Sequence, residues 1–221
     1  MKYNRTYHLP FSPGTTNDDR INYDWQGILD HELVITEKLD GENTCLKTSG
    51  VYARSHGAVN QNPWARNMWE IWERVKMDLE DEPENLDIFG ENLYGVHSIE
   101  YTNLEHYFFT FAMRKGETWL SWEQVEEISY LLSLPIAPVI AKGKFTEEDI
   151  KNIIDENQKN GSAFGGESEG VVIRIADSFH NNDFSNSVLK GVREGHVKTD
   201  EHWTRNWKRA KLIYEIGRAH V

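Results

Sequence analysis

The stretch TEKLDGEN, from Thr36 to Asn43, follows the apolar run Leu33-Val34-Ile35 and carries the pattern Lys-x-Asp-Gly. If the apolar run is a strand, Lys38 and Asp40 face the same side, because strand side chains alternate with a period of two. A lysine at a strand end, beside a carboxylate and a glycine that lets a ligand approach the backbone, suits covalent nucleotide chemistry. Lys-x-Asp-Gly is also ordinary turn chemistry, so the rest of the chain has to decide between the two interpretations.

The composition indicates a globular protein of one or two domains. The 221 residues are enough to bury a core, and 8 Trp, 9 Tyr and 9 Phe supply large apolar surfaces. The single cysteine, Cys45, excludes an internal disulfide, fits a reducing cytoplasm and is expected to be a small buried hydrophobe. There is no apolar run of about 18 residues and no apolar segment at the N-terminus, so we expect neither a membrane span nor a secretory signal.

The net charge of −12 is unusual for a protein that handles polyanions, because phosphate contacts are normally built from Lys and Arg. This charge argues against a non-specific nucleic-acid coat. It is compatible with a basic groove inside an acidic surface, since the local field matters more than the sum. Near the end of the chain, Arg205, Lys208, Arg209 and Lys211 form a basic cluster. It either follows a nucleic-acid backbone or is a solvated helix face.

Hydrophobic periodicity and turn signals predict an α+β fold of antiparallel sheet with helices packed on its faces. The expected strands span 33–36, 44–48, 51–55, 87–90, 107–113, 135–141, 171–175 and 188–190. One helix is expected to begin at Asn62-Pro63, with Asn62 as the N-cap, and to continue to about residue 79. Two more helices are expected, from the capping box at Ser121 to about residue 132 and from Thr146 to about residue 159.

Several further segments place a charged residue at the end of a strand. They are Arg54 in RSHG, Glu91 in FGENLYG, Glu169 in SEGVVIR and Lys190 in VLKGVR, with Lys198 following eight residues later. A lysine nucleophile that attacks a triphosphate needs residues of these types nearby. Cations such as Lys190, Lys198 and Arg54 neutralise phosphates, while carboxylates such as Glu169 and Glu91 hold Mg²⁺.

Each of these residues also has a simpler structural interpretation. Glu91 and Glu169 are equally well explained, one at a time, as acids in surface turns. The aromatic run Phe108–Phe111 alternates in a strand, so at least one ring belongs to the core. Trp203 and Trp207 are four residues apart, and core packing explains them better than base stacking does.

In order along the chain, KLDGEN, RSHG, FGENLYG, FFTFAMR, SEGVVIR and VLKGVREGHVK resemble six motifs of the covalent nucleotidyltransferases. These enzymes are the ATP-dependent polynucleotide ligases and the capping enzymes. TEKLDGEN is most similar to the ATP-dependent RNA ligases of phage and bacteria, and the resemblance extends from about residue 5 to residue 207. It implies a nucleotidyltransferase (ATP-grasp-like ligase) domain over residues 1–214, with antiparallel sheets, flanking helices and a nucleotide pocket between the sheets.

The resemblance also implies a role for each residue of the first motifs. Lys38 would form the covalent lysyl-AMP, and Glu37 would read the edge of the adenine. Asp40 and Asn43 would order the nucleophile and the strand-joining site. Arg54 would contact the ribose and the phosphates.

The later motifs complete the implied site. Glu91 would bind the ribose and help to position a metal, Phe111 would stack on the adenine, and Glu169 would bind the metal. Lys190 would contact the α-phosphate and act with Lys38 and Asp40 in catalysis.

The chain departs from the family pattern at two places. Ala112 follows Phe111 where an aspartate is common, and the second lysine of the usual Lys-x-Lys is missing after Lys190. Lys198 or Arg193 is expected to replace that lysine.

The expected function is therefore that of a cytoplasmic, monomeric RNA ligase. It would use ATP with Mg²⁺ or Mn²⁺ to join 3′-OH and 5′-phosphate ends, on RNA ends or nicked duplexes, through lysyl-AMP and AMP-capped RNA. The alternatives are a DNA ligase, a GTP-using capping-type enzyme, and a non-catalytic module that binds a nucleotide or an RNA end.

The last residues, 215–221, resemble the translation of a common sequencing-adapter oligonucleotide. We therefore expect the natural protein to continue past about Tyr214, into a C-terminal domain.

Overall fold

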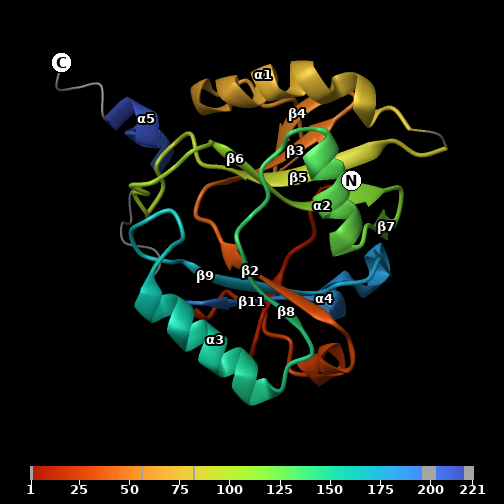
Figure 1. Cartoon of the computed structure of the whole chain (residues 1–221), viewed down its shortest axis with the longest axis vertical. Coiled ribbons are helices and arrows are strands. Elements are labelled where there is room, and N and C mark those ends of the chain that lie inside the picture. Colours follow the sequence, from red (N-terminus) through yellow and green to blue (C-terminus); the bar gives the residue numbers. More distant parts are fainter. Residues whose placement is uncertain (1, 56, 82, 196–202, 217–221) are drawn as a thin grey trace.

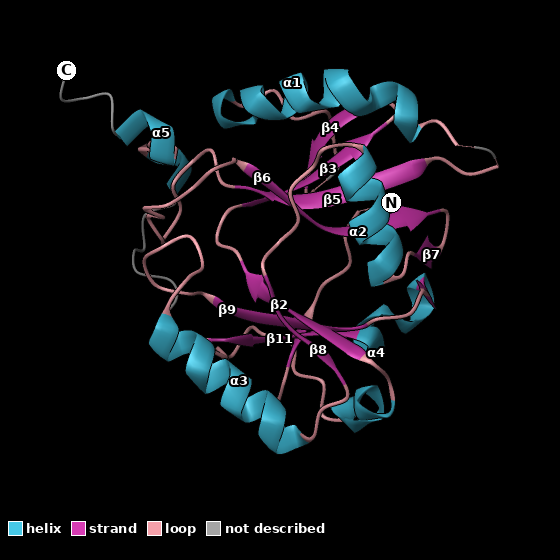
Figure 2. Cartoon of the chain, viewed as in Figure 1, coloured by secondary structure: helices cyan, strands magenta, loops and turns pink. Residues whose placement is uncertain are grey.

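The structure is a computed structural model that describes residues 2–55, 57–81, 83–195 and 203–216 (Figure 1). Two sheets lie face to face, with α1 on the outer side of one and α3 on the outer side of the other (Figures 1 and 2). The helices are α1 (Arg66–Val75), α2 (Trp122–Leu131), α3 (Glu147–Asn160), α4 (Phe184–Ser187) and α5 (Ile213–Ile216). Short 3-10 turns span Trp25–Asp30, Pro63–Ala65, Lys76–Leu79, Asn181–Asp183 and Trp203–Arg205.

The strands divide between a five-stranded and a six-stranded sheet. The five-stranded sheet has the order β1 (Tyr7–His8), β11 (Val188–Val192), β9 (Gly170–Ile175), β2 (Leu33–Lys38), β8 (Val139–Gly143). The six-stranded sheet has the order β10 (Phe179–His180), β7 (Thr118–Trp119), β6 (Phe108–Lys115), β5 (Leu86–Asn92), β3 (Glu42–Lys47), β4 (Gly50–Ala53). Each pairing within the sheets is antiparallel except β1 with β11. The predicted α+β class with antiparallel sheets is confirmed.

Local signals in the sequence located the helices well. The capping boxes at Ser121 and Thr146 both form, with each side chain accepting a hydrogen bond from the third helical N–H. Asn62 is the N-cap, as predicted, although its side chain makes no cap hydrogen bond. Instead, Pro63 opens the turn, and the carbonyl of Asn62 accepts a hydrogen bond from the Ala65 N–H at 2.9 Å.

The strand expected over residues 135–141 begins only at Val139. Pro135 and Pro138 have no N–H to donate, so this segment cannot form a full ladder. Its carbonyls accept hydrogen bonds on both sides, Pro135 O from the Thr110 N–H at 2.7 Å and Pro138 O from the Glu37 N–H at 2.8 Å. Thr110 belongs to the six-stranded sheet and Glu37 to the five-stranded one, so the segment joins the two sheets.

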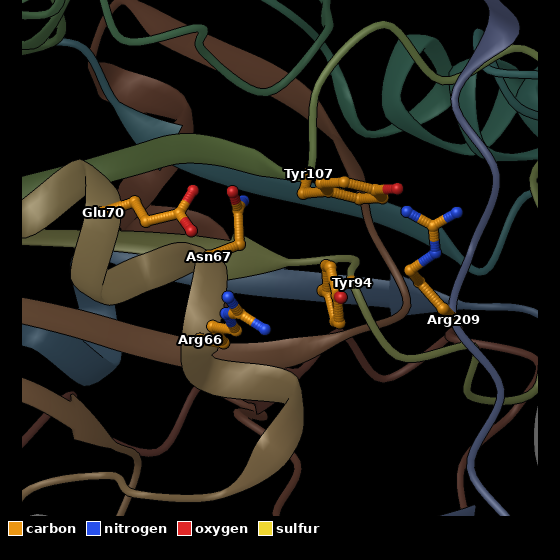
Figure 3. A pocket seen from close by; sticks show the side chains of 6 residues that line it. All are labelled: Arg66, Asn67, Glu70, Tyr94, Tyr107 and Arg209. Carbon is orange, nitrogen blue, oxygen red and sulfur yellow. The ribbon is translucent and has the colours of Figure 1, made fainter. Parts of the chain in front are cut away.

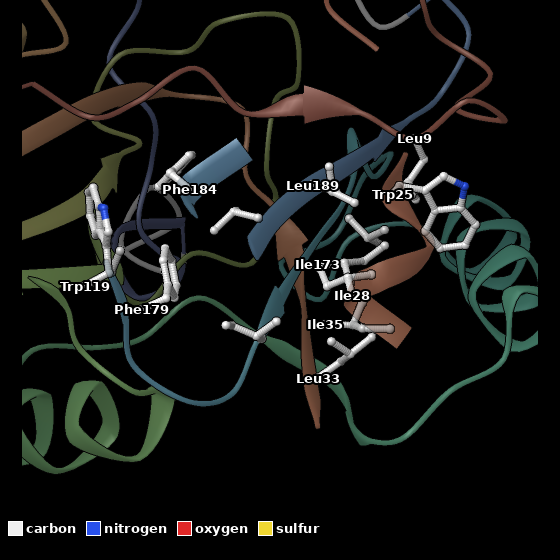
Figure 4. Close-up of a cluster of buried hydrophobic side chains, with 14 of the residues drawn as sticks. Leu9, Trp25, Ile28, Leu33, Ile35, Trp119, Ile173, Phe179, Phe184 and Leu189 are labelled. Atoms are coloured by element: carbon white, nitrogen blue, oxygen red, sulfur yellow. The ribbon is translucent and has the colours of Figure 1, made fainter. Parts of the chain in front are cut away.

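The main core cluster packs against the five-stranded sheet and extends to side chains of the six-stranded sheet. Figure 4 shows part of a buried cluster, with residues such as Leu9, Trp119 and Leu189. Tyr3 closes one end of it, with its ring 5.2–5.4 Å from four other aromatic rings. These rings belong to Phe89, Phe111, Trp119 and Phe184. Cys45 is fully buried in the same cluster, as expected, and burial raises the pKa of its thiol.

The segment Leu39–Gly41 carries the chain from the five-stranded sheet to the six-stranded sheet, because β2 and β3 belong to different sheets. Asp40 Oδ2 accepts hydrogen bonds from the N–H groups of Ser98 and Ile99, both at 2.7 Å. Gly41 lies against β5, where an added Cβ would be 2.5 Å from the carbonyl oxygen of Asn92. The crossing is therefore fixed by side-chain hydrogen bonds and by close backbone packing.

We expect the substitution Gly41→Ala to lower the free energy of unfolding by about 1–3 kcal/mol, because the new methyl group meets backbone that cannot rotate away. Gly27→Ala is the matched control, since a Cβ there meets nothing within 4 Å. Urea unfolding of both variants measures the difference. Equal unfolding midpoints would contradict the close packing at the crossing.

Candidate active site

Lys38 and Glu169 form the central ion pair of the candidate site. Lys38 ends β2 and lies opposite Gly170, the first residue of β9, so Glu169 is placed at the same edge of the sheet. The Lys38 Nζ donates a hydrogen bond to Glu169 Oε2 at 2.6 Å, and the Glu169 residue is only 7% exposed. Gly170 has φ +150, and a Cβ there would be 2.1 Å from the carbonyl oxygen of Gly191. A glycine is therefore required beside the pair.

The charge state of Lys38 follows from its neighbours. Burial alone lowers the pKa of a lysine, because it disfavours the ammonium form. Here the negative charges of Glu169 and Glu91, and to a smaller extent that of Asp40, outweigh burial. The pKa of Lys38 is therefore raised. In the free protein Lys38 is therefore an ammonium group held by carboxylates, and it must lose a proton before it can act as a nucleophile.

Glu91 brings the six-stranded sheet into the site. Its Oε1 accepts a hydrogen bond at 3.0 Å from the N–H of Gly41, in the crossing segment. Burial raises the pKa of Glu91 to about 8, with Lys38 opposing this shift and Glu169 and Asp40 adding to it. Two carboxylates from different sheets thus lie close enough to repel each other around one lysine.

Lys190 faces the same side of its sheet as Lys38. Lys190 in β11 lies opposite Val172 in β9, which lies opposite Thr36 in β2, two residues before Lys38. Directly opposed residues share a face of the sheet, and so do residues two apart in a strand. Burial and the positive charge of Lys38 lower the pKa of Lys190 to about 8.

An N-terminal strap, residues 8–14, supports the strand that carries Lys190. The N–H groups of Leu9 and Gly14 donate to the carbonyls of Lys190 and Val192 at 2.9 and 2.7 Å. Ser12 Oγ accepts a hydrogen bond from the Val192 N–H at 2.9 Å. The prolines and the glycine of this strap were visible in the sequence, but its pairing partner was not.

A buried polar array anchors this strap. His8 lies opposite Lys190 in the parallel pairing, with its Nδ1 2.9 Å from Ser12 Oγ and its Nε2 3.2 Å from Asp19 Oδ1. The pKa of Asp19 is lowered by hydrogen bonds from Thr16 and by the charges of His8 and Lys190, against the effect of burial. Asp19 therefore belongs to the electrostatic surroundings of Lys190, and no motif in the sequence pointed to it.

Asp40 has its carboxylate in the crossing segment, bonded to the N–H groups of Ser98 and Ile99. Its own N–H donates to the hydroxyl of Tyr101 at 2.8 Å. The geometry makes Asp40 a structural anchor of the crossing, next to Lys38 in the chain.

Glu37 and Asn43 each keep one buried oxygen without a hydrogen-bond partner in the described part of the chain. Glu37 points to the opposite side of β2 from Lys38, and its Oε2 accepts a hydrogen bond from the Ala163 N–H at 3.0 Å. Burial raises the pKa of Glu37. Asn43 lies opposite Glu91 and shares its face of the six-stranded sheet.

Arg54 is exposed in the turn after β4, and its charge helps to lower the pKa of Lys190. Phe111 is half-buried, with its ring edge-on to Tyr3 at 5.2 Å. Lys198 lies outside the described residues. Arg193, its alternative, pairs with Glu167 at 3.1 Å.

Among the described residues, no group of three or more His, Cys, Asp or Glu side chains is arranged to hold a metal ion. A metal at this site would have two carboxylates, Glu169 and Glu91, and would need oxygen atoms of the substrate or water to complete its shell. In the same part of the chain, no helix is long and apolar enough to cross a membrane.

Solved structures with the same fold include several ligases. A variant of the Naegleria gruberi RNA ligase with ATP and Mn has a TM-score of 0.53 and 16% identity, over 88% of this chain and 61% of that one. An archaeal ATP-dependent RNA ligase has a TM-score of 0.53 and 15% identity, over 87% and 48% of the two chains. A putative ATP-dependent DNA ligase from Aquifex aeolicus has a TM-score of 0.51 and 20% identity, over 87% and 50%.

The fold is that of the nucleotidyltransferase domain of ATP-dependent RNA and DNA ligases. The sequence model of the RNA ligase family matches residues 31–192, and the chain belongs to this family. This match includes Lys38, Glu91, Glu169 and Lys190. The chain spans about half to three fifths of the length of the solved ligases it matches. A comparison with curated proteins found no match.

The raised pKa of Glu91 predicts a pH-dependent stability. Between its unfolded value of 4.5 and its folded value of about 8, the folded protein holds a proton that the unfolded chain has lost, so stability falls as the pH rises through this window. Glu91→Gln removes this titration. We expect it to be more stable than the wild type at pH 9 and similar to it at pH 5, by thermal unfolding.

Glu156→Gln, at an exposed position in α3, is the control and should follow the pH dependence of the wild type. If Glu91→Gln followed it too, the buried carboxylate pair would not shape the stability of the site.

Proposed function

We propose that this chain is the adenylyltransferase domain, residues 1–214, of an ATP-dependent RNA ligase. The deprotonated Nζ of Lys38 attacks the α-phosphorus of ATP, an N–P bond forms, the bond to the β-phosphate oxygen breaks, and pyrophosphate leaves. The ammonium proton of Lys38 passes to water before the attack. The amine loses a second proton to water as the N–P bond forms, and it takes up a proton again when this bond breaks. The single observation that carries the proposal is the part-buried Lys38–Glu169 pair, with Lys190 on the same face of the sheet.

Two further transfers complete the proposed reaction. An oxygen of an RNA 5′-phosphate attacks the phosphorus of lysyl-AMP, so that the N–P bond breaks and the amine of Lys38 is restored. The 3′-OH of the second end then attacks the capped 5′-phosphate, gives up its proton, forms the phosphodiester and releases AMP. Lys190 and Arg54 stabilise the negative charge on the phosphate groups.

The free acceptors of the site support a purine nucleotide as the substrate. In the proposed complex the half-buried ring of Phe111 stacks on the adenine. The unpaired oxygen of Glu37 accepts a hydrogen bond from its amino group, and a buried acceptor without a partner is otherwise costly. Asn43, opposite Glu91, contacts the nucleotide at the ribose side.

We propose that Glu169 and Glu91 hold a divalent cation together with oxygen atoms of ATP. Their mutual repulsion, which adds to the raised pKa of Glu91, supports this pairing. When bound, the cation supplies positive charge that competes with the Lys38 ammonium for the carboxylates and offsets charge on the phosphates. The Naegleria gruberi ligase structures solved with ATP or AMP and Mn support the choice of ligands.

The family match favours RNA over DNA, whereas the likeness to a putative DNA ligase keeps DNA ends as the second candidate. We propose that the chain acts as a monomer in the cytoplasm, on RNA ends or on nicked duplexes. A panel of nicked RNA and DNA duplexes, sealed by the same preparation, separates the two substrates.

We expect Lys38→Ala to abolish the transfer of label from α-phosphate-labelled ATP to the protein, because the N–P bond has no other nitrogen at this position. Lys142→Ala, an exposed lysine of the same sheet, should keep the wild-type labelling. The measurement is radioactivity in the denatured protein band, with GTP as a parallel donor. Retained labelling of Lys38→Ala would remove Lys38 as the nucleophile.

Because the pKa of Lys190 is about 8, we expect nucleotide affinity to weaken as the pH rises above this value and the ammonium is lost. Lys190→Arg keeps its charge at every accessible pH and should lose less affinity than the wild type between pH 8 and 10, where Glu91 also ionises. Calorimetry with an α,β-methylene analogue of ATP measures binding without transfer. Identical pH profiles for the two proteins would show that Lys190 does not meet the phosphates.

A further inference from the structure

Two adjoining pockets lie along α1, away from the ion pair of Lys38. Their volumes are about 240 and 280 Å³, and both are bounded by Asn67 and Tyr107. We call this pair of pockets the α1 groove. Arg66 and Arg209 line the first pocket, and Arg74 lines the second. In Figure 3, Tyr94 and Tyr107 lie between Arg66 of α1 and Arg209 on the other side.

The α1 groove collects positive charge on a protein whose net charge is −12. Arg66 and Arg74 are exposed, and within the described part of the chain neither of them forms an ion pair. They are eight residues apart, so they lie about 12 Å apart along the helix and about 80° apart around it. Arg209 pairs with Glu215 at 3.0 Å, within the C-terminal segment.

Ring contacts and a hydrogen bond fix the positions of the two tyrosines in the groove. The rings of Tyr94 and Tyr107 are 4.9 Å apart at 69°, and the Tyr107 hydroxyl donates to the Ala210 carbonyl at 3.0 Å. Trp207 packs 6.0 Å from Tyr94 and 5.9 Å from Trp64. Tyr94 keeps part of its surface exposed, and Glu70 places a carboxylate in the same pocket. Fixed aromatic rings beside arginines are typical of surfaces that stack the bases of single strands.

The groove is connected to the candidate site through the end of β5. Asn92 follows Glu91, and its Nδ2 donates to the carbonyl of Trp64, just before α1, at 3.0 Å. The Tyr94 N–H donates to Asn92 Oδ1 at 3.0 Å. One strand end therefore positions a carboxylate beside Lys38 and a tyrosine in the α1 groove.

We propose that the α1 groove binds a single-stranded segment of the RNA substrate next to the reacting end. Arg66, Arg74 and Arg209 contact its phosphates, and Tyr94 stacks on a base. Glu70 accepts hydrogen bonds from base amino groups, since a carboxylate would repel a phosphate. Arg209, a member of the late basic cluster of the sequence, thus meets the nucleic-acid backbone. This inference rests on the proposed function, because it names the part of the protein that would hold the ligase substrate.

The test is binding of a short fluorescent single-stranded RNA without a 5′-phosphate, followed by anisotropy over a range of salt concentrations. The double variant Arg66→Ala/Arg74→Ala should bind at least tenfold more weakly than the wild type. Two lost phosphate contacts should reduce the slope of log affinity against log salt by about 1.4. The double variant Arg66→Lys/Arg74→Lys keeps both charges and should keep the slope.

The control is Lys144→Ala/Lys159→Ala, which removes two exposed positive charges near α3, on the other side of the molecule (Figure 1). Equal affinity and salt slope for this control and for Arg66→Ala/Arg74→Ala would overturn the proposal, as would a wild type that does not bind the RNA. Thermal unfolding verifies that each variant is folded. Lysyl-AMP labelling of the wild type, which needs no RNA, decides the proposed function separately.

Discussion

The crossing of the chain between its two sheets at Leu39–Gly41 is the constraint on which the site depends. Lys38 stands on one sheet and Glu91 on the other, and their charges interact because the crossing between the sheets is short and tightly held. Two N–H groups bind the carboxylate of Asp40 on one side of it. On the other side Gly41 packs against the backbone of β5, where any side chain would collide. The same four-residue motif therefore supplies the proposed nucleophile and fixes the distance between the sheets.

Opposing charges then decide the chemistry that this geometry allows. Around Lys38 the structure gathers two carboxylates and a second lysine, and burial makes each of their interactions stronger. Lys38 is held as a cation, while Glu91 and Lys190 both have pKa values near 8. The free site is thus poised between charge states. An incoming polyanion would bind the lysines, and a divalent cation would bind the carboxylates. Glu91 and Lys190 are only partly ionised near pH 8, so either ligand would shift their protonation.

The sequence predicted those features of the fold that depend on residues close together in the chain. The capping boxes and the β-branched run 171–175 became the elements expected of them, because their signals are local. The apolar run Leu33-Val34-Ile35 also predicted the strand that Lys38 ends. Local patterns did not predict partners across the sheets, since Lys38 and Glu169 are 131 residues apart in the chain. Only the resemblance to the nucleotidyltransferases brought these two residues into one expected site. The pairing of His8 with Lys190 and the α1 groove were missed for the same reason, and the roles of the site residues remain predictions.

The pairing of β1 with β11 has a consequence for how the chain folds. Most of the six-stranded sheet comes from one continuous stretch, β3 to β7, so it forms from local contacts. The five-stranded sheet draws on both ends of the chain, and Ser12 contacts Val192, 180 residues away. During synthesis the N-terminal segment must wait, unpaired, until β11 has left the ribosome. The strand that carries Lys190 is thus the last strand of its sheet to be made. Nucleotide binding would begin only after this strand has paired with the N-terminal segment.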